Sequence, residues 1–381
     1  MKYRNFGELD YKSSVLGFGA MRLPLTSRNY ADINEPESIR MIRYAIDHGV
    51  NYIDTAYPYH EGRSECVVGR ALKDGYREKV QLATKMPSSF IKSPIDFDRY
   101  LNEQFERLQS NRIDFYLLHG LNRRYWSELQ GLEVLNWAEG AMADGRVGHL
   151  GFSFHDDCET FNGIVDAYDN WSLCQIQYNY MDIDYQAGIR GLEYAADKGL
   201  AVVIMEPMRG GQLTKKLPER VEKLLASAHR QLTMAELSLL WVWNHPEVSV
   251  VLSGMSTMEQ VIENLATADL SGPGALTGDE LVLIDQLRET YRKLSPIPCT
   301  KCLYCMPCPN NVDIPRIFEI YNDAIMYNDL ERTGYDYRVA FKEEQHADQC
   351  FECAECEEAC PQQIPIIEWL KKAHELLGLG I

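Results

Sequence analysis

Two runs of cysteine near the C-terminal end of the chain have the spacing of metal ligands. CTKCLYCMPCP begins at residue 299, CFECAECEEACP begins at residue 350, and both close on Cys-Pro. Eight of the eleven cysteines lie in these runs. Tight Cys-x-x-Cys spacing favours a metal site over a disulfide framework, whose partners spread through a small secreted domain. The candidate ligands are Cys299, Cys302, Cys305, Cys308, Cys350, Cys353, Cys356 and Cys360.

The gaps between these cysteines indicate iron–sulfur clusters. The second run has the Cys-x2-Cys-x2-Cys-x3-Cys-Pro spacing of two-cluster ferredoxins, in which three thiolates hold one 4Fe–4S cluster and the fourth ligates the other. We therefore predict two clusters: one on Cys299, Cys302, Cys305 and Cys360, the other on Cys350, Cys353, Cys356 and Cys308. Zinc held by four cysteines is the alternative, but it explains only one Cys-x-x-Cys pair.

Polar residues that could transfer a proton follow several apolar runs earlier in the chain: Asp54 and Tyr59, Lys85, and His119. A lysine ammonium beside a tyrosine favours the phenolate and would lower its pKa from about 10, while a carboxylate would hold the lysine. A histidine could polarise a carbonyl oxygen. Together they would suit carbonyl reduction, in which the forming alkoxide must be protonated. Taken singly, a histidine or lysine at a strand end is more often structural, and Asp54 alone could cap the next segment; the order and spacing of the set favour the catalytic interpretation.

The elements that must position these residues alternate between strand and helix. Amphipathic stretches with a 3.6-residue period, such as residues 37–49, separate the apolar runs, and Gly49 is the expected stop of that helix. Eight such units predict a (β/α)8 TIM barrel, whose active site lies at the C-terminal ends of the strands. The expected strands are residues 14–21, 51–56, 80–85, 114–120, 147–153, 173–179, 201–207 and 248–254. A Rossmann fold is disfavoured, since GFGAMR has Arg22 in place of the third glycine.

From residue 296 the pattern changes. Each cysteine run leads into a helical pattern, over residues 314–328 and 364–378, and SPIP at 295–298 has the composition of a linker. We therefore expect two domains, a barrel over 1–295 and a small, mainly α-helical ferredoxin-like domain over 296–381. The link between the two runs resembles that of the α-helical ferredoxins of electron-transfer subunits.

The motifs GVNYIDTAYPYHEGRSECVVGRAL, LATK, DFYLLHG, VGHLGFS and IQYNY resemble, in order, those of the aldo/keto reductase superfamily over residues 1–295. A ferredoxin-type module behind such a barrel is an arrangement that this chain also resembles. The resemblance implies a catalytic tetrad of Asp54, Tyr59, Lys85 and His119, with Tyr59 as general acid and Tyr57 as a bystander. It also implies a nicotinamide cofactor bound across the barrel mouth. By position, the resemblance implies that Ser153 and Gln177 hold the carboxamide of the nicotinamide and that Gly19, Ala20 and Met21 lie along the nicotinamide side.

The chain departs from the family pattern in two places. Met205 stands where the family often stacks an aromatic ring on the nicotinamide, although a thioether also packs on such a ring. The phosphate-binding segment LSGMSTMEQVIEN has Gly254 and Gln260 at the positions of the lysine and arginine that grip a 2′-phosphate. The cofactor could therefore be NADPH or NADH. Glu263 and Asn264 match the adenine-side pair, and Ser256 or backbone N–H groups could meet a phosphate at a helix N-terminus.

Charge and hydropathy exclude several partners. Among 381 residues, 38 Lys and Arg face 56 Asp and Glu, which gives a net charge of −18 and argues against a nucleic-acid partner. Residues 297–381 alone hold 7 basic and 15 acidic residues. No apolar run approaches the ~18 residues of a membrane span, and MKYRNFGELD has no signal-peptide core, so we expect a cytoplasmic protein without a membrane partner.

Three functions are compatible with the sequence. The first is an NAD(P)H-dependent oxidoreductase that reduces an aldehyde, ketone or sugar-like carbonyl, with clusters that are structural or that connect it to a redox partner protein. The second is an electron-transfer or redox-sensing component whose barrel only binds nucleotide; the complete tetrad argues against it. The third is a non-catalytic scaffold barrel, and only the departure from the family pattern at Met205 supports it. No flavin signature is evident, and nothing in the sequence fixes the oligomeric state.

Overall fold

A computed structural model describes residues 1–215, 217–299, 301 and 303–378. The chain divides into two compact units. The first contains Met1–Gly210 and Leu232–Thr277, and the second contains Gly211–Gln231 and Gly278–Ile381. Each is described by itself below.

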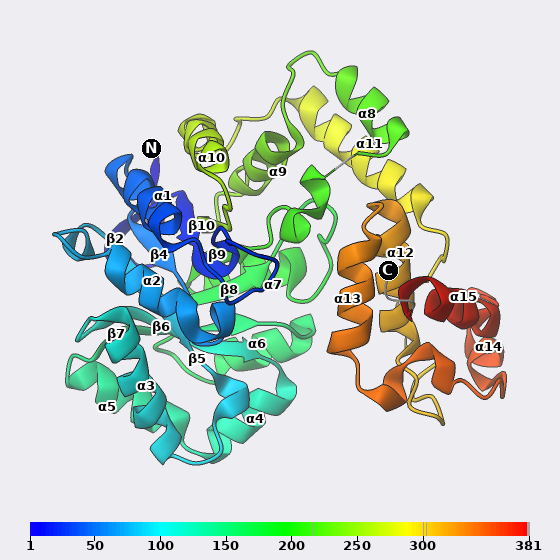
Figure 1. Cartoon of the computed structure of the whole chain (residues 1–381), viewed down its shortest axis with the longest axis horizontal. Helices are drawn as coiled ribbons and strands as arrows, with labels where there is room; N and C mark the ends of the chain where they lie inside the picture. The colour runs from blue at the N-terminus through cyan, green and yellow to red at the C-terminus, as the bar shows by residue number, and fades with distance from the viewer. Residues whose placement is uncertain (216, 300, 302, 379–381) are drawn as a thin grey trace. The chain divides into compact units, whose positions relative to one another are not determined.

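In the first unit, eight parallel strands of the described residues close into a barrel in the order β10-β3-β4-β5-β6-β7-β8-β9. Helices surround these strands (Figure 1). The predicted (β/α)8 fold is thereby confirmed, because all neighbouring barrel strands are parallel and each strand from β3 to β9 is joined to the next by a crossover, while β10 pairs with β3 to close the barrel. The barrel strands are β3 Leu16–Gly19, β4 Tyr52–Asp54, β5 Gln81–Met86, β6 Ile113–Leu121, β7 Val147–Phe154, β8 Leu173–Gln177, β9 Ala201–Met205 and β10 Val248–Ser253.

One phase of each strand faces the barrel interior, since successive side chains of a strand alternate between faces. The interior cluster includes Tyr52, Ala83, Phe115 and Leu117, all at most 1 % exposed. Continuing each strand by two residues in the same phase leads to Asp54, Lys85 and His119. The register of the barrel therefore delivers the three polar residues to one end of the apolar interior.

A hairpin closes the opposite end of the barrel. Strands β1 Tyr3–Phe6 and β2 Leu9–Ser14 pair in antiparallel fashion, and Phe6 is fully buried among the interior residues. The Phe6 ring lies 4.6 Å from that of Phe115 and 5.6 Å from that of Tyr52, centroid to centroid. Because this aromatic plug fills the N-terminal end, the C-terminal strand ends are left for a site.

The helices of the first unit follow the sequence patterns. In α1, Asn34 caps the first turn by accepting a hydrogen bond from the Glu37 amide, and Gly49 has the positive φ (96°) expected of the helix stop. The helices are α1 Glu35–Asp47, α2 Arg63–Ala71, α3 Ile95–Leu108, α4 Arg123–Gly131, α5 Val134–Ala143, α6 Cys158–Asp166, α7 Gly188–Asp197, α9 Met234–Trp243 and α10 Met258–Leu270.

The second unit is helical among its described residues. Helices α12, α13 and α15 pack on one another around an apolar core that includes Val312, Phe318, Tyr337 and Leu370. Six of the cysteines pack against this core. The helices are α8 Glu219–Ala226, α11 Gly278–Leu294, α12 Ile314–Met326, α13 Leu330–Ala340, α14 Glu355–Ala359 and α15 Ile366–Gly378.

The compact units divide at positions other than the expected boundary at 295/296. Helix α11 packs against α8 and α12, so both Gly278–Leu294 and the segment Gly211–Gln231 belong to the second unit. The SPIP stretch is also no loose linker. Ile297 is 1 % exposed, and the Asn322 side chain accepts from its amide at 3.0 Å and donates to its carbonyl at 2.8 Å.

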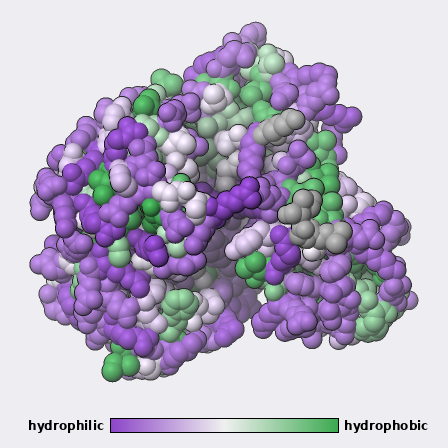
Figure 2. Space-filling model, viewed as in Figure 1, coloured by the Kyte–Doolittle hydropathy of each residue, from purple (hydrophilic) through white to green (hydrophobic). Residues whose placement is uncertain are grey.

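The face drawn in Figure 2 carries mainly hydrophilic side chains. In the part of the chain that the structure describes, no helix has both the length and the apolar character needed to cross a membrane.

Candidate active site

Lys85 is the centre of the polar cluster at the C-terminal end of the barrel. Its side chain is 0 % exposed and that of Asp54 is 3 % exposed. The Lys85 ammonium donates to both Asp54 oxygens at 2.7 and 2.8 Å, to the Thr55 carbonyl at 2.8 Å and to the Tyr59 hydroxyl at 3.4 Å. An ammonium has three protons. These three protons are therefore shared among four acceptor oxygens, of which the Tyr59 hydroxyl is the most distant.

The ionisation states follow from burial and from these contacts. Burial alone would lower the pKa of Lys85, but Asp54 and Tyr59 raise it above its ordinary value, so the lysine stays charged. For Tyr59, burial has a larger effect on the pKa than the neighbouring charges have. Burial raises the pKa of its phenol more than Lys85 lowers it, and Asp54 raises it further. The expectation of a lowered tyrosine pKa was therefore wrong, because the site is buried; Tyr59 keeps its proton at neutral pH.

His119 faces Tyr59 from strand β6. The two rings meet edge to face, with centroids 5.9 Å apart and an interplanar angle of 82°. Burial, followed by the nearby Lys85 charge and His155, lowers the pKa of His119 to about 3. A neutral imidazole offers one N–H donor and one acceptor nitrogen. Thus the structure brings Asp54, Tyr59, Lys85 and His119 together, with one charged pair and two neutral groups.

Ser153 and Gln177, expected beside a nicotinamide, are both buried at the ends of β7 and β8. The Ser153 hydroxyl oxygen accepts from the Gly120 amide at 2.7 Å. The Gln177 amide nitrogen donates to Asp182 at 3.0 Å. Sequence reasoning overlooked Asp182; its signal was an acidic residue just beyond a strand end, in the segment YNYMDID.

Met205 ends β9 and is partly exposed. The Gln175 amide nitrogen lies 3.7 Å from its sulfur, within hydrogen-bonding range for a thioether. A glutamine contact of this kind restrains an otherwise flexible side chain. Met205 is therefore held at the strand end where the family often has an aromatic ring.

The segment after β10 is largely engaged with itself. Ser256 donates its amide to the Gln260 side chain at 2.8 Å and its hydroxyl to the Arg22 carbonyl at 2.8 Å. Asn264 is 4 % exposed and donates to the Ser253 hydroxyl at 2.9 Å, whereas Glu263 is exposed. Asn264, expected on the adenine side of the cofactor, therefore holds the end of β10 through Ser253.

Gly19, Ala20 and Met21 lead from β3 towards this segment. Gly19 pairs with Asp54, and Met21 is 46 % exposed. In the sequence, Arg22 was noted only because it replaces the third glycine of a dinucleotide-binding fingerprint. In the structure, a Cβ placed on Gly254 would lie 3.2 Å from two carbons of the Arg22 stem, so this exposed arginine crosses the space that a side chain at 254 would fill.

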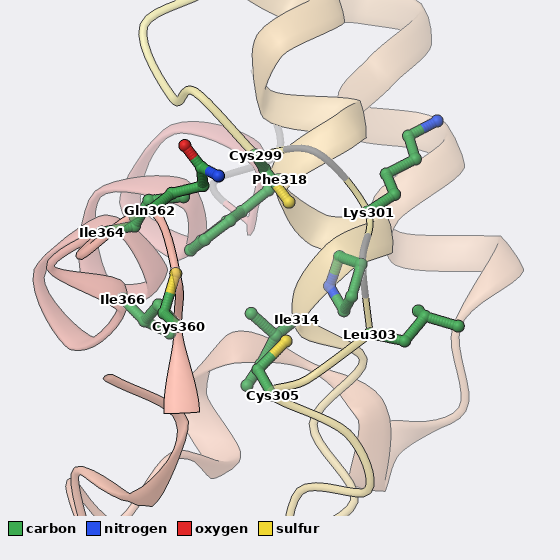
Figure 3. A pocket seen from close by; sticks show the side chains of 11 residues that line it. Cys299, Lys301, Leu303, Cys305, Ile314, Phe318, Cys360, Gln362, Ile364 and Ile366 are labelled. Carbon is green, nitrogen blue, oxygen red and sulfur yellow. The ribbon is translucent and has the colours of Figure 1, made fainter. Parts of the chain in front are cut away.

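In the second unit, Cys299, Cys305 and Cys360 line one pocket, although they come from the two separate cysteine runs. Figure 3 shows their thiols around this pocket, with apolar side chains such as Ile314 and Phe318 beside them. Cys302, the fourth ligand expected here, lies outside the described residues.

The second expected set also draws on both runs. Burial raises the pKa of Cys356 to about 11, and the charges of Cys350, Cys353, Glu357 and, last, Cys308 add to the shift, so Cys308 lies near the second run. Four such thiolates need a cation to stay ionised together, which suits the soft-ligand chemistry of an iron–sulfur cluster. Over the residues that can be placed, no three His, Cys, Asp or Glu side chains stand close enough to hold a single metal ion.

The first unit is thus a (β/α)8 barrel with a buried, Lys85-centred polar cluster at its C-terminal strand ends, and the second is a cysteine-rich helical unit. Residues 15–287 match the description "Aldo/keto reductase family" and residues 298–364 match "4Fe-4S dicluster domain". The chain belongs to the aldo/keto reductase family and carries a 4Fe–4S ferredoxin-type domain.

Relatives and solved structures match about three quarters of the chain. The chain is 26% identical over 314 residues to "Uncharacterized oxidoreductase YrpG" of Bacillus subtilis, which covers 71% of this chain and 92% of that protein. It is 25% identical over 318 residues to "L-galactose dehydrogenase" of Arabidopsis thaliana, with 78% and 95% covered. Aldo-keto reductase AKR11C1 from Bacillus halodurans, in its holo form, superposes with a TM-score of 0.62 at 26% identity, over 75% of this chain and 96% of that one.

Proposed function

We propose that this chain is an NAD(P)H-dependent oxidoreductase that reduces the carbonyl group of an aldehyde, a ketone or a sugar-like substrate. The observation that carries the proposal is the buried Lys85 ammonium, which donates to both Asp54 and the Tyr59 hydroxyl. A module that only bound nucleotide would have no need of this arrangement. The name of the plant relative, L-galactose dehydrogenase, supports a sugar-like substrate.

The chemistry assigned to these residues is proton transfer. A bound nicotinamide dinucleotide would donate a hydride to the carbonyl carbon. Tyr59, protonated at neutral pH, gives its proton to the carbonyl oxygen, and the Lys85 charge stabilises the phenolate left behind. Neutral His119 donates its N–H to the same oxygen and so helps to orient it. The phenolate regains its proton from water, and the products are the alcohol and the oxidised nucleotide.

Arg22 is the cation that we assign to the nucleotide phosphates. Family members that grip a 2′-phosphate usually carry a lysine at the position of Gly254; here the Arg22 stem crosses the space that such a side chain would fill. The guanidinium thereby replaces the missing positive charge from a different strand end. Guanidinium groups bind phosphate oxygens in a bidentate manner, so this arrangement supports a preference for NADPH.

We further propose that two 4Fe–4S clusters occupy the second unit, on the two cysteine sets predicted above. The shared pocket of Cys299, Cys305 and Cys360 supports the first set, and the proximity of Cys308 to Cys356 supports the second. Thiolates would anchor the irons, and each cluster would supply one-electron chemistry. The domains over 1–295 and 296–381, a redox partner protein and a cytoplasmic location also remain proposals.

The proposed general acid is tested by Tyr59→Phe. Removing the hydroxyl should reduce carbonyl turnover by roughly 10²- to 10⁴-fold, because no proton donor replaces it, while nucleotide binding persists. Tyr57→Phe is the matched control, since the Tyr57 hydroxyl donates instead to Glu103 at 2.6 Å. Unchanged turnover in the Tyr59 variant would exclude the tetrad assignment.

The second candidate function, electron transfer with a barrel that only binds nucleotide, is favoured by the paired cysteine sets. A nicotinamide transfers two electrons as hydride, whereas each cluster accepts one, so direct exchange would need a flavin or a radical step. Anaerobically purified protein, mixed with NADH or NADPH and no carbonyl substrate, separates the two functions. Bleaching of the cluster absorption would support electron transfer, and an unchanged spectrum would support a structural role.

A further inference from the structure

Asp182 organises the hydrogen bonds at the end of β8. One of its carboxylate oxygens, Oδ2, accepts from the side-chain nitrogens of Gln177 at 3.0 Å, Asn179 at 3.1 Å and Arg209 at 3.1 Å. The Asp182 amide in turn donates to the Asn179 side-chain oxygen at 3.0 Å. The side chains of Asp182 and Arg209 are only 11 % and 12 % exposed. This is a built, half-buried network rather than a surface ion pair.

The network fixes the direction of the Gln177 amide. An ionised carboxylate only accepts hydrogen bonds, so Gln177 must present its NH2 group to Asp182. Its carbonyl oxygen is then turned away from Asp182. Gln177 is 8 % exposed at the barrel mouth, where a rotated amide would bring two oxygens together at about 3 Å without a proton between them.

A hydrogen bond within the protein also fixes the role of Ser153, but it leaves Ser153 as a donor. Its hydroxyl oxygen already accepts the Gly120 amide at 2.7 Å, which leaves the hydroxyl proton as the group it can offer. Ser153 and Gln177 thus offer one donor and one acceptor. A primary carboxamide has the complementary pair, a carbonyl oxygen and an NH2 group.

We infer that Asp182 is a positioning residue that makes Gln177 an acceptor for the NH2 of the nicotinamide carboxamide. This inference rests on the proposed nucleotide-dependent function and on the carboxamide contact that the family resemblance implies for Gln177; it adds Asp182 as the residue that fixes the direction of the Gln177 amide. Asp182 acts through Gln177 and not on the reacting atoms.

The test compares binding of two probes to the full chain prepared anaerobically. NAD⁺ carries the carboxamide, and 3-acetylpyridine adenine dinucleotide has a methyl group in place of the NH2; the corresponding NADP⁺ pair is measured in parallel. Wild type should bind the carboxamide form roughly tenfold more tightly. The Gln177 oxygen is paired with the NH2 group of that probe and is left without a donor by the acetyl probe. Asp182→Ala should reduce the ratio to within about twofold, because Gln177 is then free to rotate.

Three further variants sharpen the result. Asp182→Asn keeps an acceptor oxygen and should retain most of the discrimination. Asp184→Asn makes the same charge change on an exposed neighbour and should retain all of it. Gln177→Leu removes the acceptor itself and should abolish the discrimination even where Asp182→Ala does not fold.

The outcomes are distinguishable. Binding of neither nucleotide by the wild type would refute the proposed function, and this inference with it. Binding of both probes with equal affinity would leave the function standing and overturn the inference. An unchanged ratio in folded Asp182→Ala, or in Gln177→Leu, would likewise overturn it.

Discussion

Replacing Asp54 with asparagine tests the energetics of the buried Lys85 charge. The side chains of Lys85 and Asp54 are 0 % and 3 % exposed, with 2.7 Å between ammonium and carboxylate. Removing one partner of such a pair costs about 3–5 kcal/mol because the other charge stays buried and uncompensated. Asparagine keeps one acceptor oxygen, so we expect about 3 kcal/mol, the lower end of that range.

The pH dependence gives a second signature. In the wild type the Lys85 pKa is raised, so its contribution to stability is present below the unfolded value of about 10.4 and is lost only as pH rises through the higher folded pKa. In Asp54→Asn, burial dominates and places the folded pKa of Lys85 below its unfolded value. The variant should therefore regain stability as pH rises towards about 10, whereas this group gives the wild type no such gain.

Urea unfolding at pH 7 to 10, followed by tryptophan fluorescence, measures both effects; every tryptophan except Trp369 lies in the barrel unit. Asp47→Asn is the control, since the Lys79–Asp47 pair is about half exposed on both sides and should contribute at most about 1 kcal/mol. A free energy of unfolding for Asp54→Asn within 1 kcal/mol of wild type, or one that does not rise with pH, would refute the reasoning.

Two further predictions concern the second unit and the nucleotide phosphates. Cys308→Ser should lower the iron content by about half and remove the cluster assigned to Cys350, whereas Cys66→Ser should change neither; full iron content in the Cys308 variant would contradict the crossed ligation. Arg22→Ala should weaken binding of NADPH about tenfold, and binding of NADH less, while Arg28→Ala on the following loop changes little. Equal effects of the two arginine variants would contradict the assignment of Arg22.

The sequence was informative about the strand ends because a strand alternates its side chains with period two. Tyr52 and Asp54, or Phe115, Leu117 and His119, share a phase, so the end of each apolar run was predictable as a site position. The two cysteine sets were predicted from spacing alone, which reflects ligand chemistry more than the fold, and they stay a prediction.

Other features depended on contacts between distant segments. The hairpin that places Phe6 against Phe115 has no signature at either position, and α11 joins the second unit only through its contacts with α8 and α12. The Tyr59 pKa was mispredicted because the cost of burying a phenolate depends on the surrounding packing, which no local pattern gives.

The sequence by itself determined the barrel and the four residues of the Lys85 cluster, because periodicity is a local property of a chain; the two cysteine sets stay a prediction from their spacing. Only the tertiary structure decided that Tyr59 keeps its proton, that Arg22 crosses the space beside Gly254, and that Asp182 holds the Gln177 amide. These outcomes depend on burial and on the direction of individual hydrogen bonds. Both arise when segments distant in sequence are packed together.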